Sequence, residues 1–214
     1  MTYEFEYLLS LVGVAALGNS LQPLRQSVSW KKIFDKASEQ TVYALAAYAA
    51  KPFWTLMDAD LRNSIRIYLY STVAYENERL KAILKLLLRF SEKNIPFALL
   101  KGCSLAALYK VPELRESADT DIYVGKKFEK SAIDLLKKEG VSIKKRVPSQ
   151  HESIAWHNAI GTIELHAFLF REEDRKAWFG RSKMFSEEIS GFCDQKIANN
   201  ENRSVLNHQT NAEF

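Results

Sequence analysis

The sequence predicts an α+β protein with a small mixed-sheet core and an N-terminal helical region. Apolar residues recur at helical spacing up to about residue 94, whereas short strand-like runs mixed with helices follow from residue 95 to residue 170. Apolar residues are sparse near the end of the chain, which predicts a helical or irregular tail. We therefore expect three regions, 1–94, 95–170 and 171–214.

The composition is that of an ordinary globular protein. Of the 214 residues, 47% are hydrophobic and 26% are charged, and the net charge of +4 does not by itself indicate a nucleic-acid-binding protein. Cys103 and Cys193 lie far apart, which favours reduced thiols over a disulfide or a cysteine metal site. The N-terminus lacks the positive charges of a signal peptide, and no apolar run approaches the ~20 residues needed to cross a bilayer. We expect a cytoplasmic protein without a membrane span.

The N-terminal region is expected to consist of helices. Ser29 is a suitable N-cap for a helix that begins at Trp30, and an alanine-rich segment over 37–50 ends at Lys51-Pro52. A long helix is predicted over 60–92. Its apolar residues at helical spacing are Ile65, Leu69, Val73, Leu80, Ile83, Leu84, Leu87 and Leu88. We interpret this stripe as core packing.

The central region alternates short strands with helices. The expected elements are a strand over 97–100, a short helix over 104–109, a strand over 120–124, a helix over 126–139, and strands over 141–147, 153–158 and 162–170. Gly140 ends the longer helix, and Ala159-Ile160-Gly161 is expected to form a hairpin turn between the last two strands.

Three carboxylates in this region predict a metal site. Asp119 and Asp121 are separated by one residue on a strand, so both point to the same face and repel each other unless a cation lies between them. Glu164 lies among apolar residues on a later strand, where a charge is costly unless it faces a site. Hard oxygen ligands of this kind suit Mg²⁺ that carries substrate phosphates, and three carboxylates can hold two ions.

The segment Lys101-Gly102-Cys103-Ser104 predicts a phosphate-binding turn. Gly102 allows close backbone approach, and the helix expected near Ser104 begins with free N–H groups. Lys101 suits a phosphate contact, with a solvated loop lysine as the alternative.

These motifs together resemble the DNA polymerase beta-like nucleotidyltransferase superfamily. Its pattern is a Gly-Ser-type turn on a short helix, Asp-x-Asp on a strand and a lone acidic residue on a later strand. The resemblance is close to a bacterial nucleotidyltransferase-like family often found near surface-polysaccharide genes. The motifs that carry it are Leu99-Leu100-Lys101-Gly102, Arg115, the segment 119–124 (DTDIYV) and Glu164-Leu165-His166. The string from Arg115 to Asp121 also looks like toxin-type nucleotidyltransferases.

The resemblance implies transfer of a nucleoside monophosphate from an NTP to a hydroxyl acceptor, which can be a small molecule, a protein or RNA. Asp119 and Asp121 would hold two Mg²⁺ or Mn²⁺ ions, and Glu164 would complete the second metal site. The residues implied in nucleotide binding are Lys101, Gly102, Ser104 and Arg115. Arg115 equally fits a salt bridge that holds the aspartate strand. His166 fits either a group that supports the metal ligands or substrate, or a core histidine whose hydrogen bonds are satisfied.

Two other functions remain open from the sequence. One is a non-catalytic relative that keeps the fold and binds a nucleotide or a partner protein, and the other is a toxin that modifies tRNA ends. The tail adds an expectation about the chain itself. A helix is expected over 171–179, and the segment 206–214 resembles the start of a stretch that relatives continue into apolar helices. We therefore expect a truncated chain.

Overall fold

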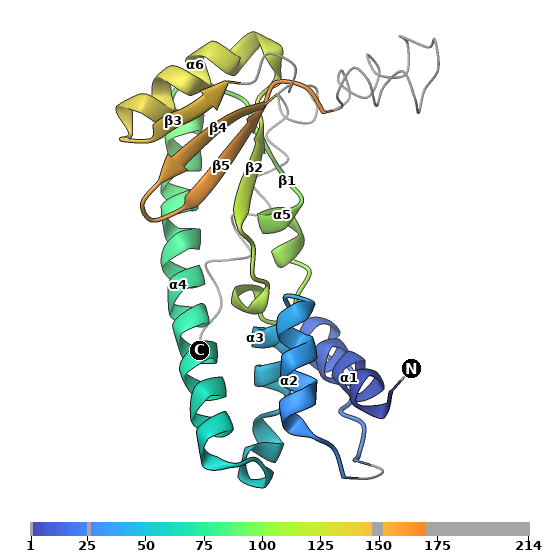
Figure 1. The fold of residues 1–214 in the computed structure, drawn as a ribbon. Coiled ribbons are helices and arrows are strands. Elements are labelled where there is room, and N and C mark those ends of the chain that lie inside the picture. The colour runs from blue at the N-terminus through green and yellow to red at the C-terminus, as the bar shows by residue number, and fades with distance from the viewer. Residues whose placement is uncertain (1, 25–26, 147–151, 170–214) are drawn as a thin grey trace, which may run out of the picture. The chain divides into compact units, whose positions relative to one another are not determined.

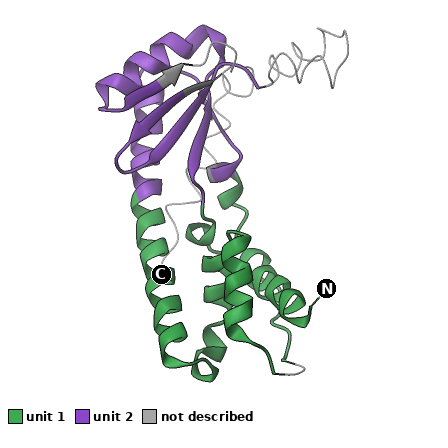
Figure 2. Cartoon of the chain, in the orientation of Figure 1, with its two compact units in different colours: residues 1–78, 105–116 green, residues 79–104, 117–214 purple. Residues whose placement is uncertain are grey.

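The computed structural model describes residues 2–24, 27–146 and 152–169, and it confirms the predicted α+β class with a helical N-terminal region. The chain divides into two compact units, coloured separately in Figure 2. A helical unit comprises residues 1–78 and 105–116, and a sheet unit comprises residues 79–104 and 117–214. The division after residue 78 falls inside helix α4 (Ala59–Glu92). The boundaries expected from the sequence at residues 94 and 170 stay predictions, and the helix expected over 171–179 lies outside the described residues.

The helical unit is built from helices before α4, as the sequence predicts for this region. They are α1 (Tyr3–Leu17), α2 (Trp30–Glu39), α3 (Tyr43–Ala49) and the 3-10 helix η1 (Lys51–Leu56). The predicted cap of α2 is confirmed, because the Ser29 hydroxyl accepts a hydrogen bond from the backbone N–H of Lys32 at 3.4 Å. None of the helices in the described ranges is both long and apolar enough to cross a membrane.

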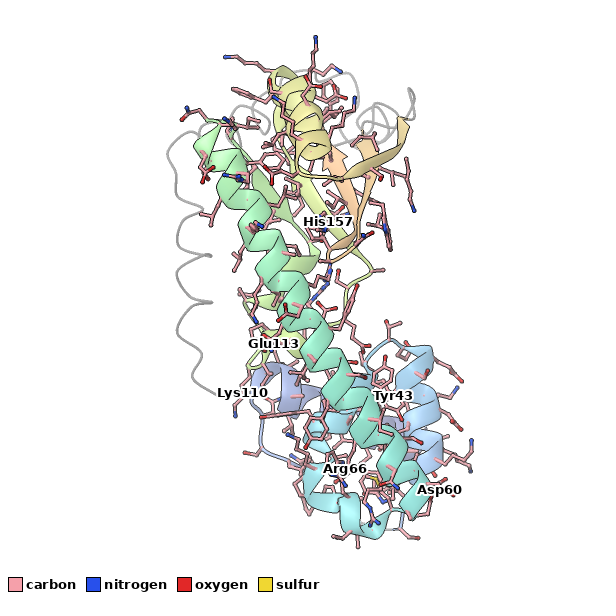
Figure 3. All side chains as sticks on the ribbon, turned by 90° about the vertical axis from the view of Figure 1, so that its left-hand side faces the viewer. Tyr43, Asp60, Arg66, Lys110, Glu113 and His157 are labelled. Carbon is pink, nitrogen blue, oxygen red and sulfur yellow. The ribbon has the colours of Figure 1, made fainter. Side chains whose placement is uncertain are left out.

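A carboxylate anchors the segment that precedes the aspartate strand within the helical unit. Glu116 accepts hydrogen bonds from the Tyr68 hydroxyl and from the backbone N–H of Ala44, the latter at 3.4 Å. Partial burial and the neighbouring Glu116 carboxylate raise the pKa of Tyr68 to about 12, so its hydroxyl remains a donor at neutral pH. The Tyr43 ring (labelled in Figure 3) packs against Tyr68 at a centroid distance of 4.5 Å.

The sheet unit is built on a mixed five-stranded sheet. Its strands are β1 (Ala98–Leu100), β2 (Asp119–Tyr123), β3 (Ser142–Arg146), β4 (Glu152–His157) and β5 (Gly161–His166), and their order is β1-β2-β5-β4-β3 (Figure 1). β2 and β5 pair in parallel, and the other neighbours are antiparallel. The predicted hairpin turn is confirmed: Gly161 has the left-handed φ of 83° that glycine adopts readily, and His157 lies at this hairpin (Figure 3).

One face of the sheet is covered by helices and carries the core of this unit. Ile122 on β2 and Ile163 and Leu165 on β5 are buried in a cluster with residues of α4 and of α6 (Gly125–Lys138), and both helices are visible in Figure 1. Their partners from the helices include Ile83, Leu86, Leu87, Phe90, Ala132, Leu135 and Leu136. Because side chains alternate along a strand, the intervening residues of β2 and β5 face the opposite side. That opposite face carries Asp119, Asp121, Glu164 and His166.

A buried arginine connects α4 to the strands from the helix-covered side. Arg79 is 2% exposed. Its guanidinium donates to the backbone carbonyl of Ile160 at 3.0 Å, the backbone carbonyl of Asp119 at 2.6 Å and the Thr120 hydroxyl at 2.9 Å. The β4–β5 turn and the first residues of β2 are therefore attached to the same point on α4.

Candidate functional site

Asp121 lies on β2, on the sheet face opposite to the one that packs against α4 and α6. In the sheet register it is paired with Leu100 of β1 on one side and with Glu164 of β5 on the other. Its side chain is only 1% exposed. Burial of an ionised carboxylate is costly unless positive charge or hydrogen-bond donors compensate it, so the groups around Asp121 decide what this position can do.

The two carboxylate oxygens of Asp121 have different surroundings. Oδ1 accepts hydrogen bonds from the ammonium of Lys101 at 3.1 Å and from Nε2 of His166 at 2.9 Å. Oδ2 is buried and has no hydrogen-bond partner among the described residues. A buried oxygen without a partner is unusual, and beside other ligand-type atoms it suits a cation.

Glu164 and His166 complete a group of metal-ligand atoms around Asp121. The parallel pairing of β2 with β5 places Glu164 opposite Asp121, and His166 lies two residues farther along the same face. One oxygen from each carboxylate and one nitrogen of His166 lie within 4.8 Å of one another. His166 Nε2 is 3.8 Å from Glu164 Oε2. Two carboxylates and one imidazole can together hold a divalent ion.

Lys101 contacts this group and is exposed to solvent. Its side chain is 68% exposed, and its backbone has the left-handed φ of 45°, which is uncommon for a residue with a side chain. The hydrogen bond to Asp121 and the charges of Asp121, Glu164 and Asp119 raise the pKa of the Lys101 ammonium, although partial burial acts in the opposite direction. Lys101 therefore carries a positive charge that partly neutralises the three carboxylates.

The turn after Lys101 leads directly into a short helix. Gly102 is buried and is the first residue of α5 (Gly102–Ala106), which begins two residues before the helix expected from residue 104. The Ser104 hydroxyl donates to the backbone carbonyl of Lys101 at 2.7 Å and so closes the turn. The part of Lys101, Gly102 and Ser104 in phosphate binding stays a prediction.

Two other residues singled out in the sequence lie apart from the ligand group. Asp119 is half-buried at the start of β2, and its carboxylate is not among the atoms that cluster with Asp121. Its charge nevertheless acts on Lys101. Arg115 follows the 3-10 helix η2 (Pro112–Leu114) and belongs to the helical unit, whereas Asp121 belongs to the sheet unit. The roles of Asp119 as a metal ligand and of Arg115 in nucleotide binding stay predictions.

A comparison with protein families identifies the chain. The family described as "Uncharacterised nucleotidyltransferase" matches residues 26–202, which is most of the chain. The protein belongs to this nucleotidyltransferase family. Comparison with curated proteins and with solved structures gives no match. The matched range includes Lys101, Asp121, Glu164 and His166, so the ligand group lies inside the part of the chain that defines the nucleotidyltransferase family.

Sequence analysis of this family member did not single out Arg79. A signal was present, because Arg79 lies four residues before Ile83 and Glu76 seven residues before it, on the buried stripe of α4. Both side chains are at most 5% exposed. A charged residue at a stripe position indicates a buried polar contact, and Arg79 uses this position to reach the backbone of β2.

Proposed function

We propose that the protein is a metal-dependent nucleotidyltransferase that transfers a nucleoside monophosphate from an NTP to a hydroxyl acceptor. The observation that carries the proposal is the buried Asp121 carboxylate, whose Oδ2 has no partner among the described residues and which lies in one group with Glu164 and His166. Membership of the nucleotidyltransferase family supports the reaction class.

The residues present fit the divalent cation that this chemistry requires. Asp121 and Glu164 would hold it, and Asp119 at the start of the same strand is a candidate ligand for a second ion. Divalent cations in such a site supply positive charge to the triphosphate and lower the pKa of the attacking hydroxyl. A pair of carboxylates beside a lysine can exist without an ion, but Oδ2 of Asp121, which has no partner in the described ranges, favours a site that binds one.

The side chains of this chain would position the reactants and move one proton. The acceptor oxygen attacks the α-phosphorus, its new P–O bond forms, and the bond from the α-phosphorus to the oxygen of the β-phosphate breaks, so that pyrophosphate leaves. Glu164, whose side chain is 24% exposed, is accessible enough to take the proton of the acceptor hydroxyl. The exposed Lys101 ammonium would bind the phosphate oxygens.

A labelling experiment tests the proposed reaction. Each NTP, labelled with ³²P at the α-phosphate, is incubated with the protein, a divalent metal and cell extract. We expect label on an acceptor from an α-labelled NTP and none from the same NTP labelled at the γ-phosphate. Label on a small molecule, a protein or RNA identifies the acceptor class, and label on tRNA ends indicates the toxin-type function. NTP binding without any labelled product would contradict the proposed transfer reaction and favour the non-catalytic alternative.

Substitution of Lys101 by methionine should affect metal and nucleotide in opposite directions. The ammonium of Lys101 occupies Oδ1 of Asp121, so its removal leaves more negative charge for an ion, whereas the triphosphate loses a cationic partner. We expect Lys101→Met to bind Mn²⁺ several-fold more tightly without nucleotide and to bind the NTP about tenfold more weakly, the loss of one charge-assisted hydrogen bond. Calorimetric titrations of each ligand measure both effects.

The exposed Lys130 on α6 provides the control for this pair of measurements. Lys130→Met removes the same charge outside the ligand group and should leave both affinities unchanged. If Lys101→Met weakens metal and nucleotide alike, Lys101 is a structural support of the site and has no separate contact with phosphate.

A further inference from the structure

We propose that His166 is itself a ligand of the cation, through Nε2, and that the site therefore prefers a first-row transition ion such as Mn²⁺ or Zn²⁺ over Mg²⁺. This inference rests on the cation site of the proposed function and names the ion that the site selects. The group that carries it is Asp121, Glu164 and His166 on the neighbouring parallel strands β2 and β5.

The distances between the ligand atoms fit a shared ion. Ligand atoms at ~2.0–2.2 Å from one metal ion lie about 3 to 3.5 Å apart around it. Nε2 of His166 is 2.9 Å from Asp121 Oδ1 and 3.8 Å from Glu164 Oε2. These two separations differ from that range by only a few tenths of an ångström, all three ligand atoms lie within 4.8 Å of one another, and the strand register already holds their backbones side by side.

The burial of two of the three side chains supports the same conclusion. The side chain of His166 is 13% exposed and that of Asp121 is 1% exposed, so neither is an ordinary solvated surface group. Oδ2 of Asp121 has no partner in the part of the chain that the structure describes, although Oδ1 has two. An ion bound at Oδ2 would satisfy this atom and leave the contact between Oδ1 and Lys101 in place, whereas Nε2 of His166 would exchange its hydrogen bond to Oδ1 for the ion.

The donor set then determines the preference. Mg²⁺ prefers oxygen ligands and gives up water reluctantly, whereas imidazole nitrogen suits Zn²⁺ best among these ions, and Mn²⁺, which shares the carboxylate preference of Mg²⁺, is the weakest-binding of the first-row transition ions that can also accept it. A site of three carboxylates would favour Mg²⁺. With imidazole in the third position, the same site gains affinity for transition ions and gains little for Mg²⁺.

Ion titrations of the whole chain without nucleotide test the inference. Free Mn²⁺ is measured by electron paramagnetic resonance, and Mg²⁺ is added as a competitor. We expect Mn²⁺ to bind at least about tenfold more tightly than Mg²⁺. His166→Gln, which offers an amide oxygen in place of the nitrogen, should lower Mn²⁺ affinity on the order of 10- to 100-fold and change Mg²⁺ affinity little. The control is His157→Gln at the β4–β5 hairpin (Figure 3), which should bind both ions as the parent does.

A measurement on the parent protein keeps the inference testable if His166→Gln folds poorly. With ¹⁵N-labelled histidine, binding of Zn²⁺ should shift the Nε2 resonance of His166 and fix the ring proton on Nδ1, because a ligating nitrogen carries no proton. An unshifted His166 resonance at saturating Zn²⁺, or equal affinity for Mn²⁺ and Mg²⁺, would overturn the inference. These titrations contain no NTP, so a negative result would overturn the role of His166 and leave the proposed transfer reaction with Mg²⁺ untouched. Conversely, Mn²⁺ binding through His166 in a protein that transfers no nucleotide would contradict the proposed function and not the role of His166.

Discussion

Replacement of Asp121 by asparagine is expected to lower nucleotidyl transfer on the order of 100- to 1,000-fold, the loss typical of removing one stabilising group from a transition state. Asparagine keeps the size of the side chain and one oxygen, so the hydrogen bonds to Oδ1 have a counterpart. It removes the negative charge that would hold the cation together with Glu164. The measurement is the initial rate of transfer from an α-labelled NTP.

Metal and nucleotide binding separate this effect from misfolding. The parent should melt at a higher temperature with a divalent metal and NTP, because ligands that bind only the folded state stabilise it by mass action. Asp121→Asn should melt cooperatively without this increase. Asp134→Asn, an exposed position on α6, is the matched control and should behave as the parent. A full increase in melting temperature in Asp121→Asn would show that this carboxylate does not hold the ion.

Several elements of the fold were predictable because their signals are local. The hairpin turn at Ala159-Ile160-Gly161, the cap at Ser29 and the strand that carries Asp121 each depend on a few consecutive residues, and the structure confirms all three. The prediction that Asp119 and Asp121 share one face likewise required only the two-residue period of a strand.

The pairing that assembles the site is not local. Asp121 and Glu164 meet because β2 pairs in parallel with β5, and no feature of either strand alone specifies that partner or that register. The same limit applies to His166, because its contact with Asp121 follows from the register of β2 and β5. Sequence analysis could place His166 on the face of Glu164, but not beside Asp121.

The long helix α4 shows a second limit, which is the choice of buried face. Leu88 was expected in the apolar stripe, but it is 55% exposed, so that expectation was wrong. Leu86 and Phe90 are buried in its place, at 5% and 0% exposure. In this part of α4, apolar residues occupy more than one side of the helix. Their spacing alone therefore did not determine which of them face the sheet.

Replacement of Arg79 by methionine is expected to destabilise the sheet unit by about 3 kcal/mol. Methionine fills part of the same volume but donates no hydrogen bonds, so the carbonyls of Asp119 and Ile160 lose a charged donor. Each hydrogen bond to a charged group contributes about 1.5 to 3 kcal/mol, and the energy recovered by no longer burying a guanidinium offsets part of the loss. Urea unfolding followed by circular dichroism measures the change in the free energy of unfolding.

Two further variants test whether Arg79 acts through its buried contacts. Arg66→Met changes an exposed arginine of the same helix, labelled in Figure 3, and should alter the free energy of unfolding by less than about 0.5 kcal/mol. Arg79→Lys keeps the charge but cannot reach three acceptors with the geometry of a guanidinium, so its stability should lie between those of the parent and Arg79→Met. Equal stability of Arg79→Met and Arg66→Met would mean that these hydrogen bonds contribute nothing net to folding.

Because Arg79 binds the backbone of Asp119, two residues before Asp121, Arg79→Lys should also weaken Mn²⁺ binding under conditions where the variant is fully folded.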